Sequence, residues 1–214
     1  MDSNSKYECS CVECKLKTLF FDKNQVLHLF MANETTYCDY TKNLDKNNVH
    51  KIYHDTQYGY ALDSDNELFG RLILEINQAG LSWNTILNKQ DNFRKAYSNY
   101  SIKTIANYND EARTRLLNDA GIIRNRLKIN AVIHNAQILI EIQKKFGSFQ
   151  SWLDNNHPKT RDEWVKLFRK TFKFTGGEIT NEFLMSTGYL KGAHQKNCII
   201  YEKILKEKPK WNTN

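Results

Sequence analysis

The sequence predicts an all-α fold. Its 214 residues include only two prolines and nine glycines, a composition that suits long helices rather than a turn-rich β fold. Apolar residues also recur at helical spacing in two stretches, 68–79 and 129–140. Because 40% of the residues are hydrophobic, such helices can bury a packed core in one sizeable domain or two small ones.

Helices are expected from Asp63 onward, and several carry their own start or stop signal. Acidic residues precede the first, and a carboxylate offsets the partial positive charge at a helix N-terminus. A later segment begins at an Asn/Asp cap and ends at Gly121. The segments expected to be helical are, in order, LFGRLILEINQA, WNTILNKQDNFRKAY, NDEARTRLLNDAG, the stretch around 129–140, TRDEWVKLFRK and NEFLMSTGYL.

The chain divides by composition into three segments. Residues 1–36 contain CSCVEC and a short apolar patch but no strong helix caps, and we expect an N-terminal extension of unknown role. Residues 37–206 are expected to form the helical domain, and 207–214 a tail. No stretch approaches the ~20 apolar residues that span a bilayer, and TLFFDK is too short for a signal peptide. No membrane partner is therefore expected.

Charge and cysteine content bear on the partner and the compartment. The formal net charge is +7 and the pI is about 9.0, which favours a polyanion such as nucleic acid or an acidic membrane. A basic surface that only keeps the chain soluble is the alternative. The five cysteines are an odd number without a secretion signal, which is typical of a reducing compartment. We therefore expect a cytoplasmic protein whose cysteines are thiols or metal ligands.

Glu75 has two interpretations. On a helical wheel it lies at the edge of the apolar face that contains Leu68, Leu72 and Ile76, four residues after Arg71. It is either half of a solvated Arg71–Glu75 pair or a carboxylate that faces a pocket. Aromatic residues surround it in the sequence.

These aromatics lie in YHDTQYG, Tyr53 to Gly59, with Tyr40 upstream and Trp83 downstream of Glu75. Aromatic rings near a carboxylate can form a slot for a flipped nucleic-acid base. Packing in the core is the commoner role of Tyr and Trp and remains the alternative.

The stretch LLNDAGIIRNRLKINAVI predicts two helices that meet across a very short turn containing Gly121. The second helix is expected to open with Arg124, Arg126 and Lys128. Free N–H groups at a helix start bind phosphate, and adjacent cations add Coulomb attraction. This is the arrangement of a helix-hairpin-helix DNA clamp, although an ordinary αα-corner has the same pattern.

Two cysteines and two histidines are candidate metal ligands. His194 and Cys198 are four residues apart, the spacing of one helix face, and Cys38 and His54 lie far upstream. Two Cys and two His make a closed tetrahedral zinc site, which is structural because no position is left open. Unrelated thiols and imidazoles are the alternative, since sequence spacing does not link such distant pairs.

Taken together, these motifs resemble the DNA-3-methyladenine glycosylase I family. The resemblance covers residues 38–200 and lies in YHDTQYG, LFGRLILEINQAGLSWNTIL, DAGIIRNRLKINAVIHNA, FKFTG and HQKNC. It implies a helix-hairpin-helix glycosylase fold with one structural zinc ion per chain that ties the N- and C-terminal segments of the domain. The implied zinc ligands are Cys38, His54, His194 and Cys198.

The resemblance also implies roles for the pocket. Glu75 corresponds to the carboxylate that recognises the base and is the candidate catalytic residue. Gly80 and Leu81 correspond to the wedge beside the flipped nucleotide, and Gly121, Arg124, Arg126 and Lys128 belong to the DNA clamp. The implied base-binding aromatics are Tyr40, Tyr53, Tyr58 and Trp83.

The function implied is hydrolysis of the N-glycosidic bond of 3-methyladenine in alkylated double-stranded DNA. The reaction releases the free base and leaves an abasic site, and a monomeric enzyme without lyase activity is expected. A non-catalytic, zinc-stabilised DNA-binding module is the alternative. A zinc hydrolase or nuclease is disfavoured because a closed Cys/His set leaves no open metal position.

The sequence departs from the family pattern at several places. Gln57 and Tyr58 stand where a glutamate and a tryptophan are usual, and Tyr40 replaces a common tryptophan. Tyrosine preserves a π face, so stacking is expected to persist. The segment 155–175 is shorter than in many members, which bears on DNA contacts on that side.

Overall fold

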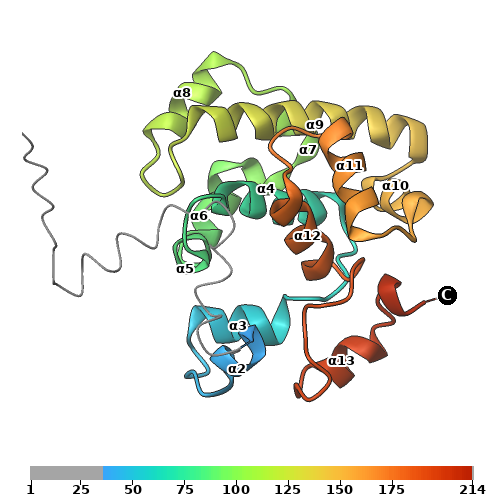
Figure 1. The fold of residues 1–214 in the computed structure, drawn as a ribbon. Coiled ribbons are helices and arrows are strands. Elements are labelled where there is room, and N and C mark those ends of the chain that lie inside the picture. The colour runs from blue at the N-terminus through green and yellow to red at the C-terminus, as the bar shows by residue number, and fades with distance from the viewer. Residues whose placement is uncertain (1–35, 214) are drawn as a thin grey trace, which may run out of the picture. The chain divides into compact units, whose positions relative to one another are not determined.

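The computed structural model describes residues 36–213, and every regular element in that range is a helix (Figure 1). The all-α prediction is confirmed for this part of the chain. The extension expected for residues 1–36 lies outside the described residues except for Thr36. The helices are α2 (Tyr37–Lys42), α3 (Val49–Thr56), α4 (Asp65–Gln78), α5 (Trp83–Leu87), α6 (Gln90–Ala96), η2 (Ser98–Tyr100), α7 (Ile102–Ala106), α8 (Asp110–Asn118), α9 (Arg126–Phe146), α10 (Phe149–Asn156), α11 (Arg161–Thr171), α12 (Gly177–Ser186), α13 (Tyr201–Lys206) and η3 (Lys210–Asn212).

Helix α4 lies at the centre of this domain. Its residues from Leu68 to Asn77 are all buried, and it contacts α5, α9, α10 and α12. The long helix α9 passes over it together with α7 and α8 (Figure 1). Because residues 68–77 of α4 are all buried, the polar side chains in this part of the helix face protein rather than bulk water.

The sequence-based element boundaries need four corrections. Helices α2 and α3 precede Asp63, where the helical region was expected to begin. The stretch 83–97 is divided into α5 and α6. Residues 207–213 pack on the domain instead of forming a tail, since the Trp211 amide donates to Gly188 O and Lys210 pairs with Asp154 at 2.9 Å. The fourth correction concerns the turn before α9.

The turn that precedes α9 is longer than expected. Helix α8 ends at Asn118 and α9 begins at Arg126, so Arg124 lies in the turn and not in the second helix. Asn125 is the N-cap, and its side chain accepts hydrogen bonds from the amides of Leu127 and Lys128. Gly121 donates its amide to Asp119 Oδ1 at 2.7 Å, which tightens the bend.

Two lysines tie this turn to neighbouring segments: Lys128 joins it to the turn between α4 and α5, and Lys89 joins it to the start of α6. Lys128 Nζ donates to the carbonyls of Asn77 at 2.8 Å and Ala79 at 2.6 Å. Lys89 Nζ donates to the carbonyl of Ala120 at 2.9 Å. Cations that bind the free carbonyls at a helix C-terminus are favourable. The two turns therefore form one connected unit.

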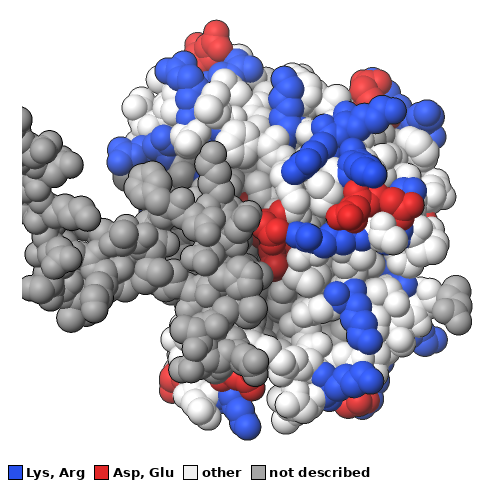
Figure 2. Space-filling model, in the orientation of Figure 1, with Lys and Arg blue, Asp and Glu red and all other residues white. Residues whose placement is uncertain are grey.

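Among the described residues, no helix combines the length and the apolar character needed to cross a bilayer. Lys and Arg side chains outnumber acidic ones on the face shown in Figure 2. They gather most densely over the region that contains α11 in Figure 1.

Candidate functional site

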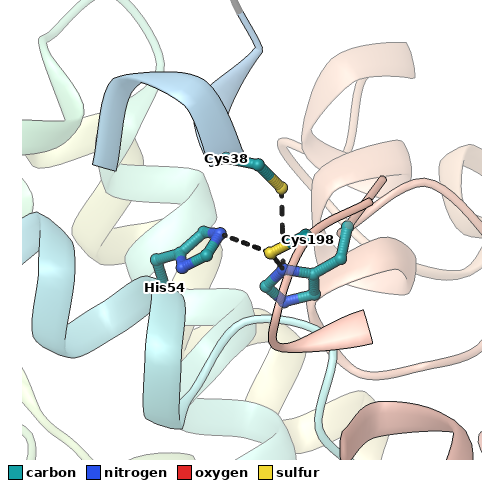
Figure 3. Close-up of side chains that lie close together, drawn as sticks. Cys38, His54 and Cys198 are labelled. Atoms are coloured by element: carbon teal, nitrogen blue, oxygen red, sulfur yellow. Dashed lines mark hydrogen bonds between the residues drawn. The ribbon is translucent and has the colours of Figure 1, made fainter. Parts of the chain in front are cut away.

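Four candidate metal ligands converge in space. Cys38 lies on α2 and His54 on α3, while His194 and Cys198 lie in the loop before α13 (Figure 3). All four ligand atoms lie within 4.8 Å of one another. Cys198 Sγ lies 3.7 Å from both His54 Nε2 and His194 Nδ1. The structure corrects one detail, since His194 and Cys198 are in a loop and not on a helix.

The geometry suits a tetrahedral ion. Zinc bonds of about 2.0–2.3 Å to nitrogen and sulfur separate neighbouring ligand atoms by roughly 3.3–3.8 Å. The distance from Cys38 Sγ to His194 Nδ1 is 3.8 Å, within that range. Burial raises the pKa of the Cys38 thiol to about 11, so a nearby cation is needed to hold its thiolate at neutral pH.

Both imidazoles are oriented by their second ring nitrogen. His54 Nδ1 lies 2.7 Å from Asp55 Oδ1, and His194 Nε2 lies 2.8 Å from the carbonyl oxygen of Tyr58. Burial lowers the pKa of both, that of His194 to about 4, which keeps the rings neutral. Neutral imidazoles held in this way are typical metal ligands.

Glu75 is a buried carboxylate without a hydrogen-bond donor in the described part of the chain. Its side chain lies near the C-terminal end of α4, and the residue is 3% exposed. Burial raises its pKa to about 8, the charge of Glu182 adds to this, and Arg71 opposes it. A carboxylate that the protein leaves unpaired is available to a ligand.

The interpretation of Arg71 and Glu75 as a solvated ion pair is wrong. Arg71 is 5% exposed, and its guanidinium donates to the Tyr53 hydroxyl at 3.2 Å and to the carbonyls of Gln57 and Ser186 at 3.4 Å. It also lies over the Tyr53 ring. Arg71 therefore holds the wall of the site while Glu75 stays free.

The rings of Tyr53, Tyr58 and Trp83 form an aromatic wall beside two carboxyl groups, those of Glu75 and Glu182. The ring of Tyr53 lies 5.5 Å from that of Tyr58 and 5.1 Å from that of Trp83. Burial raises the pKa of Tyr53 well above 10.0; Arg71 opposes this, and Glu75 and Glu182 add to it. Tyr40 lies farther out in the same cluster and contacts His50 and Tyr37.

Sequence reasoning missed three residues of this cluster. Tyr37 packs edge-on against Tyr58 and its hydroxyl lies 3.1 Å from His50 Nδ1. Glu182, on α12, accepts a hydrogen bond of 3.1 Å from the Tyr58 hydroxyl. Glu182 carries the same signal as Glu75, a carboxylate among apolar residues of a predicted helix.

The residues predicted to contact DNA fall into two groups. Gly80 is exposed with a φ of 79°, and Leu81 packs partly on the core. Arg124 and Arg126 are exposed, and within the described chain their backbone amides have no acceptor. Lys128 is instead 5% exposed, with its ammonium on two carbonyls. The expectation that Lys128 contacts a phosphate is therefore corrected to a role inside the protein.

Comparison with known proteins covers most of this domain. The family model for methyladenine glycosylase matches residues 43–166. DNA-3-methyladenine glycosylase 1 of Escherichia coli (strain K12) is 32% identical over 168 residues, which span 70% of this chain and 89% of the relative. The chain belongs to the methyladenine glycosylase family. The DNA-3-methyladenine glycosylase of Haemophilus influenzae is 28% identical to this methyladenine glycosylase over 182 residues. The aligned region covers 77% of this chain and 97% of the Haemophilus protein.

Solved structures agree with this assignment. A variant of 3-methyladenine DNA glycosylase I in complex with 3-methyladenine aligns with a TM-score of 0.66 and 27% identity, over 73% of this chain and 94% of that one. The 3-methyladenine DNA glycosylase I of Staphylococcus aureus aligns with a TM-score of 0.65 and 28% identity, over 73% and 93%. The match to the methyladenine glycosylase family model includes Glu75, whereas Cys38, His194 and Cys198 lie outside it.

Proposed function

We propose that this chain is a base-excision repair DNA glycosylase that hydrolyses the N-glycosidic bond of 3-methyladenine in alkylated double-stranded DNA. The observation that carries the proposal is Glu75, a buried carboxylate without a donor among the described residues, whose charge acts on Tyr53 of the aromatic wall. The relatives are named for this base, and one solved neighbour holds it. The products are the free base and an abasic site.

The chemistry follows from the charge of the damaged base. In DNA, 3-methyladenine is cationic, and this weakens its bond to the sugar. A flipped cationic ring packs against the aromatic wall of Tyr53 and Trp83 with a cation–π attraction of about 0.5–2 kcal/mol. The ionised Glu75 accepts a hydrogen bond from the exocyclic amine while water attacks the sugar carbon. Unmodified adenine has no such charge and binds poorly.

We infer a monofunctional reaction on a monomer. Strand cleavage by a glycosylase with lyase activity needs an amine nucleophile, and the amine of Lys128 is bound to the carbonyls of Asn77 and Ala79. One chain carries Glu75, the aromatic wall and the exposed arginines together, which supports action as a monomer.

We also propose that the Cys38, His54, His194 and Cys198 cluster holds one structural zinc ion. When bound, the ion neutralises the two thiolates and joins α2 and α3 to the loop before α13. Four protein ligands leave no position for water or substrate, so the ion takes no part in base release.

DNA is proposed to bind at the unit formed by the two connected turns. Gly80 and Leu81 act as the wedge that fills the space left by the flipped base. The turn 119–125 acts as a helix-hairpin-helix clamp, with the free amides and the side chains of Arg124 and Arg126 on a phosphate. Lys128 positions the two turns relative to each other, and Lys89 holds the turn 119–125 to the start of α6.

The test is base release from methylated duplex DNA, with the free bases identified by chromatography. We expect 3-methyladenine in the supernatant and alkali-sensitive abasic sites in the DNA without strand breaks before alkali. DNA binding without any released base would favour the non-catalytic module instead.

Replacing Arg126 with alanine is expected to weaken binding to damaged and undamaged duplexes alike. Loss of one phosphate contact lowers the slope of log K against log salt by about one. Fluorescence anisotropy over a salt series measures this slope. Lys203→Ala on α13 removes the same charge elsewhere and serves as the control. Equal slopes for both variants would rule out the clamp at Arg126.

The rate of base release is expected to rise with pH. Burial raises the pKa of Glu75 to about 8, so below that pH the ionised fraction falls about tenfold per pH unit. The pH dependence of kcat/KM reports the free enzyme, and its acid limb is expected near pH 8. Glu75→Gln has no such ionisation and should lose this limb. A flat profile between pH 6 and 9 for the native enzyme would contradict the assignment.

A further inference from the structure

A second carboxyl group, on a different helix, lies close enough to Glu75 to interact with its charge. Glu182 lies on α12, which packs against α4. The Tyr58 hydroxyl donates to Glu182 Oε2 at 3.1 Å. Glu182 Oε1 is buried, and no group in the described chain donates a hydrogen bond to it. One oxygen therefore holds the aromatic wall while the other is left without a partner.

The charges around this pair do not balance. Among the groups that interact with Glu75 and Glu182, Arg71 is a cation and the hydroxyls of Tyr53 and Tyr58 are neutral. Glu178 and Arg161 also act on Glu182, but they form an ion pair with each other. Two ionised carboxylates and the Arg71 guanidinium leave one net negative charge.

The titration of both carboxyls reflects this excess. Burial raises the pKa of Glu182 to about 7, and the charge of Glu178 raises it further. The Tyr58 hydroxyl, Asn181 and Arg161 act in the opposite direction and lower this pKa. The charge of Glu182 contributes to the raised pKa of Glu75. Near neutral pH the pair therefore holds a proton that a bound cation would displace.

We propose that Glu182 is a second specificity-determining carboxylate of the base site, which with Glu75 makes the site select a positively charged ring over a neutral one. This inference rests on the proposed glycosylase function. A cationic base neutralises the net charge of the site, whereas a neutral base leaves two buried like charges facing each other. The Tyr58 hydroxyl positions Glu182 and links it to the aromatic wall.

The test is Glu182→Gln, because glutamine keeps the size and can still accept from Tyr58 but carries no charge. Two ligands distinguish the effect of charge: cationic 3-methyladenine within methylated duplex DNA, and the free base, which is neutral at pH 9 and acts as an inhibitor. We expect kcat/KM on DNA at pH 9 to fall about tenfold, the effect of one pKa unit of lost interaction. The inhibition constant of the free base should stay within about twofold, because no charge attraction is lost.

The pH profile provides an independent readout. Without the neighbouring charge, the acid limb of kcat/KM should move about one pH unit toward acid. Tyr58→Phe removes the donor that stabilises ionised Glu182, so Glu182 carries less charge near pH 8 and the limb should also move toward acid, by a smaller amount. This second variant tests the proposal if Glu182→Gln does not fold. Glu202→Gln, on α13, is the matched control.

The proposal is overturned if Glu182→Gln keeps the native rate and pH profile, or if it weakens the cationic and the neutral base equally. The second result would mean that Glu182 only supports the wall. Failure of the proposed function is separate, because it would show as no release of 3-methyladenine by the native enzyme.

Discussion

Replacing Glu75 with glutamine is expected to lower the release of 3-methyladenine about ten- to hundredfold. The substitution preserves size but removes the charge that accepts from the cationic base, an interaction worth roughly 1.5–3 kcal/mol. Single-turnover assays on methylated duplex DNA measure the loss. The melting temperature should hold or rise. Because the folded pKa of about 8 exceeds the unfolded value, ionising Glu75 destabilises the fold as pH rises above about 4.5.

Glu67→Gln is the matched control, since Glu67 lies on the same helix but forms a half-exposed pair of 2.6 Å with Arg94. We expect it to change base release by less than about twofold. Arg71→Ala is unsuitable as a mild control, because Arg71 is buried and holds Tyr53. Equal, small effects of Glu75→Gln and Glu67→Gln would exclude Glu75 from base recognition.

The surroundings of Glu75 could be predicted only in part from the sequence. Apolar spacing predicted the helix and placed Glu75 at the edge of its apolar face. A helical wheel describes one helix alone, so it does not indicate whether the remaining face meets water or another helix. Here α12 covers that face and buries both Arg71 and Glu75. Tertiary packing therefore decided between two interpretations that local pattern left open.

The turn before α9 shows a second limit. Gly121 and the basic residues predicted the turn and its neighbouring helices. The basic residues alone place the start of α9 at Arg124, two residues early, whereas Asn125 is the N-cap that sets the start at Arg126. A lysine near a helix start is usually solvated, so the burial of Lys128 had no local signal. Its partners are the carbonyls of Asn77 and Ala79, far away in sequence.

The Cys/His cluster and the aromatic wall were the parts of the candidate site that the sequence predicted least, because tertiary folding brings their residues together. Helix α2 has 6 residues and α3 has 8, too short for a clear apolar period. Their side chains Cys38 and His54 meet the loop that contains Cys198 only after folding. The residue types alone made these cysteines and histidines candidate ligands, and the family resemblance implied that the four belong to one site. Glu182 and His50 belong to no such motif and were found only in the structure.

Tyr58 connects the Cys/His cluster to Glu182 and the aromatic wall. Its carbonyl oxygen lies 2.8 Å from His194 Nε2, and its hydroxyl donates to Glu182 at 3.1 Å. Gly59, next in the chain, has a φ of 84° and packs against Ala193, where an added Cβ would meet the alanine side chain at 2.9 Å. The cluster thus supports the aromatic wall of Tyr53, Tyr58 and Trp83 through the backbone of Tyr58. Loss of the metal should act through stability.

Replacing Cys198 with serine is therefore expected to remove the metal and to destabilise the fold together. Serine supplies no thiolate, and the three remaining ligands hold zinc far more weakly. Loss of a structural metal is among the few single changes that cost more than about 4 kcal/mol of unfolding free energy. For a chain of this size, that lowers the melting temperature by on the order of 10 °C. Elemental analysis and thermal melting of the same preparations measure both effects.

His134→Gln is the control, because it removes an imidazole on α9 that does not belong to the four-residue cluster, and it should leave the zinc content as it is. A structural metal also predicts how activity is lost. Below its melting temperature, Cys198→Ser should release base in proportion to its folded fraction, whereas loss of a catalytic metal would abolish release in a protein that stays folded. Native protein that contains no zinc, and melts at the same temperature as Cys198→Ser, would refute the structural site, because neither the thiolate nor an ion would then be holding α2 and α3 to the loop before α13.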